Sequence, residues 1–199
     1  MAVVAVTGDA IEKENPDMLT PALEYARRGW RVFPVHTPGP EGLCTCGTVD
    51  CRNAGKHPRN HNGVSGATAD RDQIRKWWAM WPTANIGLAT GSASGIFVVD
   101  VDVRNGGLET LKTLEAEHGD TVLGQLRVKS GGGGLHGYHR QLRNQPITSG
   151  SNVLGPGIDL KADGGYIIAP PSLHASGNRY TWLTESGTLE KTDFPMDPE

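Results

Sequence analysis

The sequence lacks the features of a membrane protein and of a disulfide-bonded secreted scaffold. Its 199 residues contain no apolar run that approaches the ~18 residues of a membrane-spanning helix. The opening residues, MAVVAVTGDAIEKEN, carry acids and no basic segment, unlike a secretory signal. Cysteine is scarce, and its odd count of 3 argues against a disulfide framework. We therefore expect a cytoplasmic protein with no membrane association.

An excess of positive charge is also missing. Lys and Arg number 19 and Asp and Glu 22, which gives a formal net charge of −3. Such a charge is not typical of nucleic acid binding, but carboxylates that hold divalent cations lower the formal charge, and the bound cations reverse its sign locally. The basic residues also gather in one region, which contains Arg52, Lys56, Arg59, Arg71, Arg75 and Lys76. The charge balance therefore does not exclude a nucleic acid partner.

Apolar residues make up 37% of the chain, which suffices for one folded core. The pair Thr20-Pro21 predicts the start of a helix, with Thr20 as its N-cap. Asp70 with Gln73 resembles the capping box of a second helix, and Gly119 closes a third. Short apolar runs predict strands over residues 30–35, 86–89, 96–103, 126–129, 135–139, 157–161 and 166–169. We predict an α+β fold in which residues 162–165 form a hairpin turn between the last two strands.

The predicted domain organisation is simple. A loose leader occupies residues 1–17, one folded domain spans residues 18–185, and an acidic tail at residues 186–199 begins a linker. Residues 42–62 are poor in apolar side chains and rich in Cys, Gly and His, so we interpret them as a loop-like insert in the domain, called here the Cys-His insert.

The segment Gly95-Ile-Phe-Val-Val-Asp-Val-Asp is the most informative part of the sequence. Its apolar residues predict a buried strand that ends in Asp100 and Asp102. Because side chains alternate along a strand, these two carboxylates point to the same face. Carboxylates this close repel each other unless a cation joins them, and Mg²⁺ and Mn²⁺ prefer oxygen ligands. The pair predicts a divalent-metal site, and two solvated acids at a strand end are the alternative.

A third acid occurs in the segment Gly157-Ile-Asp-Leu-Lys. Asp159 and Lys161 share one face of the predicted strand. A carboxylate that completes a metal site, beside a cation that meets a phosphate, suits phosphoryl transfer. A surface Asp–Lys ion pair explains the same spacing equally well.

The run Ser130-Gly-Gly-Gly-Gly-Leu-His predicts a loop that binds an anion. Glycines let the backbone approach a ligand closely and turn its N–H groups toward negative charge. No Gly-Lys-Ser/Thr follows, and a strand comes next, which excludes a P-loop and a Rossmann fingerprint. We expect His136 to donate a hydrogen bond to a triphosphate or to a primer 3′ end. A flexible hairpin with a packed histidine is the alternative.

The Cys-His insert supplies three thiolates and one imidazole. Cys44, Cys46, Cys51 and His57 form a set suited to tetrahedral Zn²⁺, although the C-x-C opening is tighter than the usual C-x₂-C. The insert has little apolar content to keep it folded, and structural zinc contributes on the order of 10–16 kcal/mol to small modules of this kind. We predict one structural zinc ion with His57 as its fourth ligand and His61 as the alternate.

Together these features resemble the bifunctional primase-polymerase (prim-pol) family of the archaeo-eukaryotic primase superfamily, from about residue 20 to about residue 182. The resembling segments are Ala22-Leu-Glu-Tyr-Ala-Arg-Arg-Gly-Trp-Arg-Val-Phe-Pro-Val, Gly55-Lys-His-Pro-Arg, Asn85-Ile-Gly-Leu-Ala-Thr-Gly, Val99-Asp-Val-Asp, Ser130-Gly-Gly-Gly-Gly-Leu-His and Gly157-Ile-Asp-Leu-Lys-Ala-Asp-Gly-Gly-Tyr-Ile-Ile-Ala-Pro-Pro-Ser.

The resemblance implies an RRM-like catalytic sheet with a flanking helical and strand module. It implies that Asp100, Asp102 and Asp159 bind two catalytic ions of Mg²⁺ or Mn²⁺. The residues that it implies in nucleotide binding are Ser130, Gly132, Gly133, His136 and Lys161.

The implied activity is that of a DNA primase and DNA polymerase. A 3′-hydroxyl attacks the α-phosphate of a nucleoside triphosphate, while metals lower the pKa of the hydroxyl and stabilise the pyrophosphate. The implied partners are a DNA template and primer, dNTPs or NTPs, and a helicase domain or partner in the replication of a phage, plasmid or other mobile element. Because no helicase region or helical priming part follows, we expect primer extension more firmly than de novo priming.

Two other classes of function stay open on the sequence. A DxD-type glycosyltransferase would also use paired acids and a metal to bind a nucleotide diphosphate. A non-catalytic, zinc-bearing DNA-binding module would use the Cys-His insert but would leave the three acids without a role.

Overall fold

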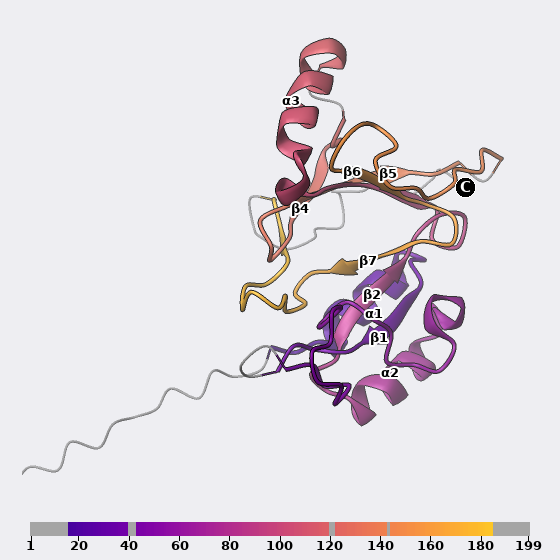
Figure 1. Ribbon diagram of the computed structural model, residues 1–199. Coiled ribbons are helices and arrows are strands. Elements are labelled where there is room, and N and C mark those ends of the chain that lie inside the picture. Colours follow the sequence, from indigo (N-terminus) through magenta and orange to yellow (C-terminus); the bar gives the residue numbers. More distant parts are fainter. Residues whose placement is uncertain (1–15, 40–42, 120–121, 143, 185–199) are drawn as a thin grey trace, which may run out of the picture.

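The computed structural model describes residues 16–39, 43–119, 122–142 and 144–184 (Figure 1). These residues form a mixed α/β fold with two antiparallel sheets, in agreement with the predicted combination of helices and hairpins. The acidic tail and most of the predicted leader lie outside the described residues.

The described residues contain the following elements. The strands are β1 (Val32–Val35), β2 (Asn85–Ala89), β3 (Ile96–Val101), β4 (Leu126–Lys129), β5 (Leu135–Arg140), β6 (Ile158–Lys161), β7 (Tyr166–Ala169) and β8 (Thr181–Trp182). The helices are α1 (Leu19–Arg27), α2 (Arg71–Met80) and α3 (Gly107–His118), with short 3₁₀ helices η2 (Gly63–Gly66) and η3 (Val103–Asn105). None of these helices has the length and apolar character needed to cross a lipid bilayer.

The two sheets lie between the helices (Figure 1). The smaller sheet has the strand order β1-β2-β7, and the larger has the order β6-β3-β5-β4-β8. Helix α3 covers the outer face of the larger sheet, while α1 and α2 pack beside β1 of the smaller one. The inner faces of the two sheets therefore meet in the middle of the molecule.

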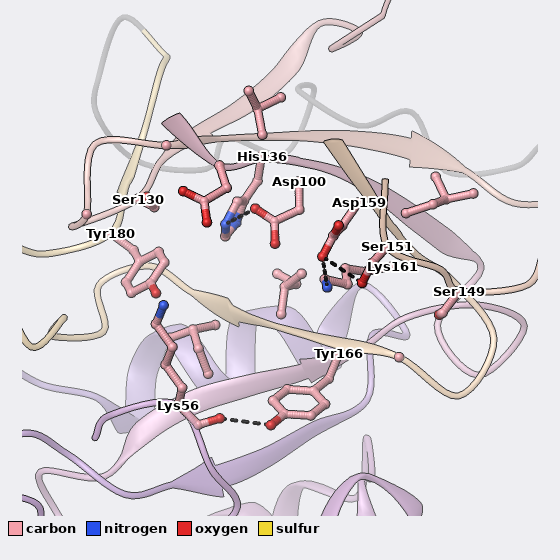
Figure 2. Close-up of a pocket in the computed structure, with 18 of the residues that line it drawn as sticks. Lys56, Asp100, Ser130, His136, Ser149, Ser151, Asp159, Lys161, Tyr166 and Tyr180 are labelled. Carbon is pink, nitrogen blue, oxygen red and sulfur yellow. Dashed lines mark hydrogen bonds and ion pairs between the residues drawn. The ribbon is translucent and has the colours of Figure 1, made fainter. Parts of the chain in front are cut away.

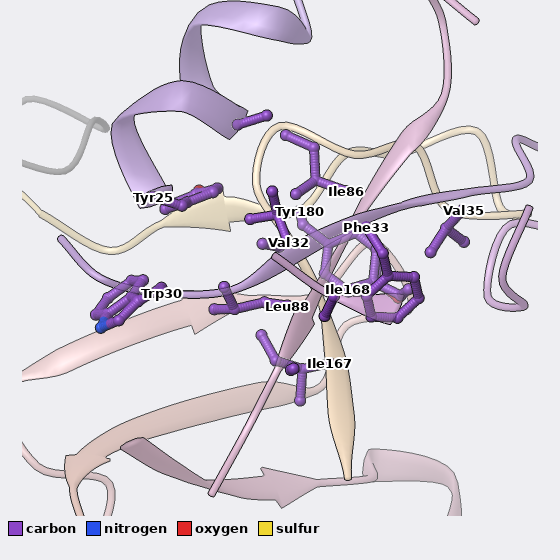
Figure 3. Packing of buried hydrophobic residues seen from close by; sticks show 14 of the residues in the cluster. Tyr25, Trp30, Val32, Phe33, Val35, Ile86, Leu88, Ile167, Ile168 and Tyr180 are labelled. Atoms are coloured by element: carbon purple, nitrogen blue, oxygen red, sulfur yellow. The ribbon is translucent and has the colours of Figure 1, made fainter. Parts of the chain in front are cut away.

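The main hydrophobic core includes residues of α1, α2 and both sheets (Figure 3). Phe33 and Leu88, which lie on opposite faces of the smaller sheet, belong to it, as do Val98 and Tyr138 of the larger sheet. Trp30 stacks on Tyr138 with a ring-centroid distance of 6.0 Å, which joins the segment before β1 to β5. These buried apolar contacts fix the two sheets relative to each other.

The two faces of the larger sheet differ in chemistry. Val99 and Val101 pack toward α3 in a second, smaller core together with Leu111 and Ile158. The alternate residues of β3, including Asp100, face the smaller sheet, because strand side chains alternate between the two faces. The alternation predicted for the segment 96–101 thus places one face on a helix and the other on the inter-sheet space.

Helix α1 corrects one sequence prediction. Thr20 is not its N-cap, because the helix begins at Leu19 and the carboxylate of Asp17 accepts hydrogen bonds from the N–H groups of Leu19 and Thr20, at 2.9 and 3.2 Å. Pro21 is tolerated in the first turn, where an N–H group has no intrahelical acceptor. The helix ends at Arg27, and Gly29 follows it with a φ of 78°.

The other predicted helix ends are confirmed. The carboxylate of Asp70 accepts hydrogen bonds from the N–H groups of Asp72 and Gln73, so it caps α2. Gly119 is the C-cap residue of α3. In both cases the signal is local to a few consecutive residues.

The predicted hairpin at residues 162–165 is wrong. Strand β6 pairs with β3 in the larger sheet and β7 pairs with β2 in the smaller one, so the segment crosses from one sheet to the other. The segment between β2 and β3 makes a second crossing, and the two crossings are bonded to each other. Thr90 Oγ1 donates to the carbonyl of Ala162 at 2.8 Å, and Ser92 N–H donates to the carboxylate of Asp163 at 2.7 Å. These contacts hold the segment away from a hairpin geometry.

Candidate active site

A cavity of about 590 Å³ opens between the two sheets beside the main core (Figure 2). Its volume lies within the roughly 300–1,000 Å³ of small-molecule sites. The sequence-predicted residues that line it are Asp100, Asp102, Ser130, Gly132, His136, Asp159 and Lys161. The other predicted nucleotide contact, Gly133, is exposed and is not among the lining residues. The fold therefore brings together side chains from β3, β5 and β6 and from the glycine loop.

Three of these residues form a row across the larger sheet. Asp159 on β6 is the register partner of Asp100 on β3, which is in turn the register partner of His136 on β5. Directly opposite residues of neighbouring strands point to the same face. Figure 2 shows the three side chains together along the upper wall of the cavity. We call Asp159, Asp100 and His136 the acid row.

Asp102 lies beside this row but not on the strand. The predicted strand 96–103 ends at Val101, and Asp102 instead caps the 3₁₀ helix η3. Its carboxylate accepts hydrogen bonds from the N–H of Arg104 at 2.9 Å and from the side-chain amide of Asn105 at 2.8 Å. Its own N–H donates to the carbonyl of Gly157 at 2.8 Å, which fixes it next to the start of β6.

The carboxylate of Asp159 has the most partners. It accepts a hydrogen bond from Lys161 Nζ at 2.8 Å and from the N–H of Asn152 at 3.0 Å. Burial opposes ionisation, but these hydrogen bonds outweigh it and hold the pKa of Asp159 below its usual value. Asp159 is therefore ionised at neutral pH, with Lys161 already beside it as the sequence predicts.

The three carboxylates suit hard cations, although they are not a compact ligand group in the described residues. Each borders an open cavity, and Mg²⁺ binds through one or two carboxylates while it keeps waters or substrate oxygens as its other ligands. Asp100 and Asp159 are cross-strand neighbours, so one cation can draw on both. The donor set and the open cavity thus fit Mg²⁺ or Mn²⁺.

His136 is buried at one end of the acid row. It is 5% exposed, and its Nε2 lies 3.5 Å from Asp100 Oδ1. Burial lowers the pKa of His136, and the carboxylate of Asp100 only partly offsets this effect. The imidazole is therefore neutral at neutral pH and can donate one hydrogen bond.

The glycine loop connects β4 to β5 as a tight turn. Ser130 N–H donates to the carbonyl of Gly134 at 2.8 Å, and Gly133 N–H donates to the carbonyl of Ser130 at 2.9 Å. The N–H groups of Gly132 and Gly134 make no hydrogen bond to any residue that the structure describes. Both glycines line the cavity, so they can offer N–H groups to an anion there.

The Cys-His insert forms a second cluster of metal ligands. The ligand atoms of Cys44, Cys46, Cys51 and His57 all lie within 4.8 Å of one another. Cys44 Sγ is 3.3 Å and Cys51 Sγ is 3.5 Å from His57 Nε2. Tetrahedral zinc, with Zn–S bonds of about 2.3 Å, holds its ligand atoms roughly 3.5–3.8 Å apart. The cluster could therefore hold a zinc ion with little rearrangement, and the alternate ligand His61 is outside it.

The thiol of Cys46 is already inclined to ionise. Hydrogen bonds from the hydroxyl and N–H groups of Thr48 lower the pKa of Cys46 to about 6. A metal binds the thiolate form, so this environment favours a metal ligand over an inert thiol.

Sequence reasoning missed the lower wall of the cavity. Tyr166 on β7 and His174 and Tyr180 near β8 line it. Tyr166 lies in one of the resembling segments but was given no role, and His174 and Tyr180 lie in none of them. Lys56 of the Cys-His insert also lines it, although the sequence analysis placed Lys56 only in a general basic region. Tyr166, His174 and Tyr180 follow the crossing between the sheets at residues 162–165, which the hairpin prediction did not allow.

Comparison with protein families identifies a relationship over nearly the whole chain. The family model described as "Bifunctional DNA primase/polymerase, N-terminal" matches residues 22–196. No curated protein matches the chain in a separate comparison. The matched range contains the acid row, Asp102, the glycine loop and the Cys-His insert.

Proposed function

Because the chain belongs to the bifunctional DNA primase/polymerase (Prim-Pol) family, we propose that the cavity between its sheets adds nucleotides to a primer on a DNA template. The observation that carries this proposal is the pairing of Asp100 with Asp159 across β3 and β6, with Asp102 at the same cavity. Family membership supports primase and polymerase activity, and the acid row supports a metal-dependent mechanism at this place.

In the proposed mechanism, Asp100, Asp102 and Asp159 hold two ions of Mg²⁺ or Mn²⁺. When bound, these ions lower the pKa of the primer 3′-hydroxyl and stabilise charge on the leaving pyrophosphate. The three carboxylates lie at the end of β3 and on β6 and border the cavity. The nucleophile is the primer hydroxyl, so no side-chain nucleophile is required. The hydroxyl attacks the α-phosphate in line, and pyrophosphate leaves.

The nucleotide is proposed to lie against the glycine loop. Gly132 borders the cavity with an N–H group that has no partner in the described residues, and Ser130 lies beside it. His136 donates a hydrogen bond to the nucleotide from its neutral imidazole, and Lys161 neutralises phosphate charge while it orients Asp159. The predicted role of Gly133 is then limited to shaping the turn, since its φ is 92°.

The larger sheet with α3 is proposed as the RRM-like catalytic sheet, and the smaller sheet with α1 and α2 as the flanking module. We keep the proposed domain at residues 18–185, with the Cys-His insert at residues 42–62 holding a structural zinc ion. Partners are a DNA template and primer, dNTPs or NTPs, and a helicase domain or partner, in the replication of a phage, plasmid or other mobile element.

Primer extension tests the proposal. The chain is incubated with Mg²⁺ or Mn²⁺, a primed DNA template and one labelled dNTP at a time, with an unprimed template alongside. We expect addition of the dNTP that is complementary to the template base. Addition that ignores the template base would contradict template direction, and transfer of label from a nucleotide sugar alone would favour a glycosyltransferase. DNA binding without any addition would reduce the chain to a binding module.

A further inference from the structure

We propose that the Cys-His insert supplies the cavity with a substrate-binding residue, Lys56, whose ammonium group binds the phosphates of the incoming nucleoside triphosphate and is held in place by the zinc centre. This inference rests on the proposed function, because it assigns the nucleotide to the same cavity. The Cys3His cluster would then position a residue of the nucleotide site in addition to stabilising the fold of the insert.

Lys56 lies between two ligands of the cluster and also borders the cavity. Lys56 directly precedes the ligand His57 and follows the ligand Cys51 within a short turn, in which Lys56 N–H donates to the carbonyl of Asn53 at 2.9 Å. Lys56 and Asn53 both line the cavity, while the ligand atoms of the cluster point toward one another. Figure 2 shows the Lys56 side chain pointing into the space below Asp100, beside Tyr180.

The backbone of this turn is anchored to the smaller sheet. The hydroxyl of Tyr166 on β7 donates to the carbonyl of Lys56 at 2.9 Å. The side chain of Asn85, which is 1% exposed, donates to the carbonyl of Gly55 at 3.0 Å. Gly55 has a φ of 78°, and a Cβ atom there would lie 2.7 Å from Pro38 Cδ. The turn therefore approaches the sheet closely and holds the start of the Lys56 side chain at the cavity wall.

The ammonium group of Lys56 has no counter-ion among the described residues, unlike Lys161, which is paired with Asp159. Its side chain points into the cavity, and its charge acts on another lining residue: burial lowers the pKa of His174, and Lys56 lowers it further. A partly buried cation without a carboxylate partner favours an anionic ligand. Lys acts as a point charge for phosphate.

A zinc ion in the cluster would bind His57, the residue that follows Lys56. Tyr166 and Asn85 hold two carbonyl groups of the turn. Two contacts tie the turn to the cysteines in the described residues: the Asn53 N–H donates to Cys51, and the His57 imidazole lies against Cys44 and Cys51 in the cluster. Loss of the metal removes its hold on the His57 imidazole and on Cys51, which flank the turn, while the His57 carbonyl still accepts a hydrogen bond from His36 N–H at 3.0 Å. Zinc binding and nucleotide binding are then coupled, and the coupling is reciprocal.

The test measures nucleotide binding without catalysis. A fluorescent dATP analogue is titrated in Mg²⁺ and without DNA against wild type, Lys56→Ala, Lys56→Arg and Lys112→Ala. Lys112 is an exposed control on α3, on the far side of the larger sheet. We expect Lys56→Ala to weaken binding about ten- to a hundred-fold, since a hydrogen bond to a charged group contributes that much. We expect Lys56→Arg to recover part of the loss and Lys112→Ala to change nothing.

Two further arms identify the phosphates involved. The loss in Lys56→Ala should shrink with the corresponding monophosphate analogue, because fewer phosphates remain to be bound. Binding of a primed template, measured without nucleotide, should be unchanged. Unchanged triphosphate affinity in Lys56→Ala, or a loss confined to DNA binding, would overturn the inference.

A double-mutant cycle tests the zinc coupling. Cys51→Ser should weaken binding of the dATP analogue in wild type but have little further effect in Lys56→Ala, because the residue that the metal positions is already gone. Cys46→Ser replaces it if Cys51→Ser does not fold. Additive losses would refute the coupling. A wild-type protein that binds the analogue but never extends a primer would instead refute the proposed function.

Discussion

The Cys-His insert and the acid row are both groups of metal-ligating side chains, and they are assembled in opposite ways. The four ligands of the insert come from residues 44–57 and lie within 4.8 Å of one another. The carboxylates come from β3 and β6, and they are neighbours only because these strands pair. The first group is closed by four protein ligands, as structural zinc sites are. The second borders a cavity of about 590 Å³.

The side chains that surround the two groups of ligands also differ. The thiols and imidazole of the insert face one another, whereas Asp159 is held by Lys161 and Asp102 by the residues of η3. We infer that the insert is complete without substrate, while the carboxylate site takes oxygen atoms of the substrate to complete its cations. The proposed structural centre and the proposed catalytic centre therefore differ in the coordination positions that their ligands leave open.

The largest expected effect is on catalysis at the open site. Asp100→Asn should reduce primer extension at least about a thousandfold, because it removes a direct metal ligand, and loss of even one transition-state hydrogen-bond donor costs 10²–10³-fold in other enzymes. The matched control is Asp72→Asn, whose exposed carboxylate on α2 pairs with Arg75 and with no other charged group among the described residues. Thermal unfolding of both variants should match wild type. Near-normal extension by Asp100→Asn would remove the acid row from catalysis.

The next effect concerns the closed site. Elemental analysis should find about one zinc per chain in wild type, and Cys51→Ser should lower zinc affinity at least about 100-fold, since even outer contacts of a ligand contribute 10–100-fold. His61→Asn is the control, because His61 is outside the cluster. Protein prepared without chelator that contains no zinc, or a loss of zinc in His61→Asn alone, would contradict the assignment.

Substitution of His136 should have an intermediate effect on nucleotide addition. It distinguishes the nucleotide site from the metal site, because His136 is proposed to contact the nucleotide and not the metals. His136→Ala should slow nucleotide addition about ten- to a hundred-fold, which corresponds to one hydrogen bond to a charged group. Binding of primed template should change little, because His136 is buried at the end of the acid row. A variant that loses template binding but keeps its nucleotide affinity would place His136 in the DNA path or in the core.

The smallest effect is a change in the pH dependence of the carboxylate site. Lys161 helps to hold the pKa of Asp159 below its usual value. A carboxyl with a depressed folded-state pKa contributes stability above its unfolded pKa and loses that contribution as the pH falls through the folded one. Lys161→Met should therefore raise the pKa of Asp159. As the pH falls, the variant should then lose the stability contributed by the Asp159 carboxylate at a higher pH than wild type does. Carbon-13 NMR titration of the carboxyl measures the change, with Lys129→Met as control, and an unchanged pKa would show that Lys161 does not hold Asp159.

Local signals in the sequence predicted local structure well. The cap at Asp70 and the C-cap at Gly119 involve a few consecutive residues, and both are confirmed. The Cys3His ligands are equally local, and the structure gathers the four that the sequence favoured. Thr20 failed as a cap because the helix begins one residue before it, at Leu19, where Asp17 accepts hydrogen bonds from the N–H groups of Leu19 and Thr20. Asp17 and Thr20 are both residue types that cap helices, and the sequence does not rank them.

The path of the chain between sheets could not be predicted in this way. The spacer at 162–165 has the composition of a hairpin turn, but the bond from Ser92 N–H to Asp163 directs it to another crossing. Because that contact joins segments far apart in sequence, no local pattern encodes it. The same error concealed Tyr166 and Tyr180, which reach the cavity only after the crossing. Strand alternation predicted the face of Asp100 on β3 and of Asp159 on β6, but not the position of Asp102 or the wall opposite them.

Direct measurement of Mn²⁺ binding tests the central contrast between the two sites. Electron paramagnetic resonance counts bound and free Mn²⁺ in wild type, Asp100→Asn and Cys51→Ser, without nucleotide or DNA. We predict Mn²⁺ binding in wild type and in Cys51→Ser, because hard cations prefer the carboxylate oxygens, and its loss in Asp100→Asn. Binding of Mn²⁺ to Asp100→Asn with wild-type affinity, or its loss only in Cys51→Ser, would contradict the assignment of the acid row as the catalytic metal site.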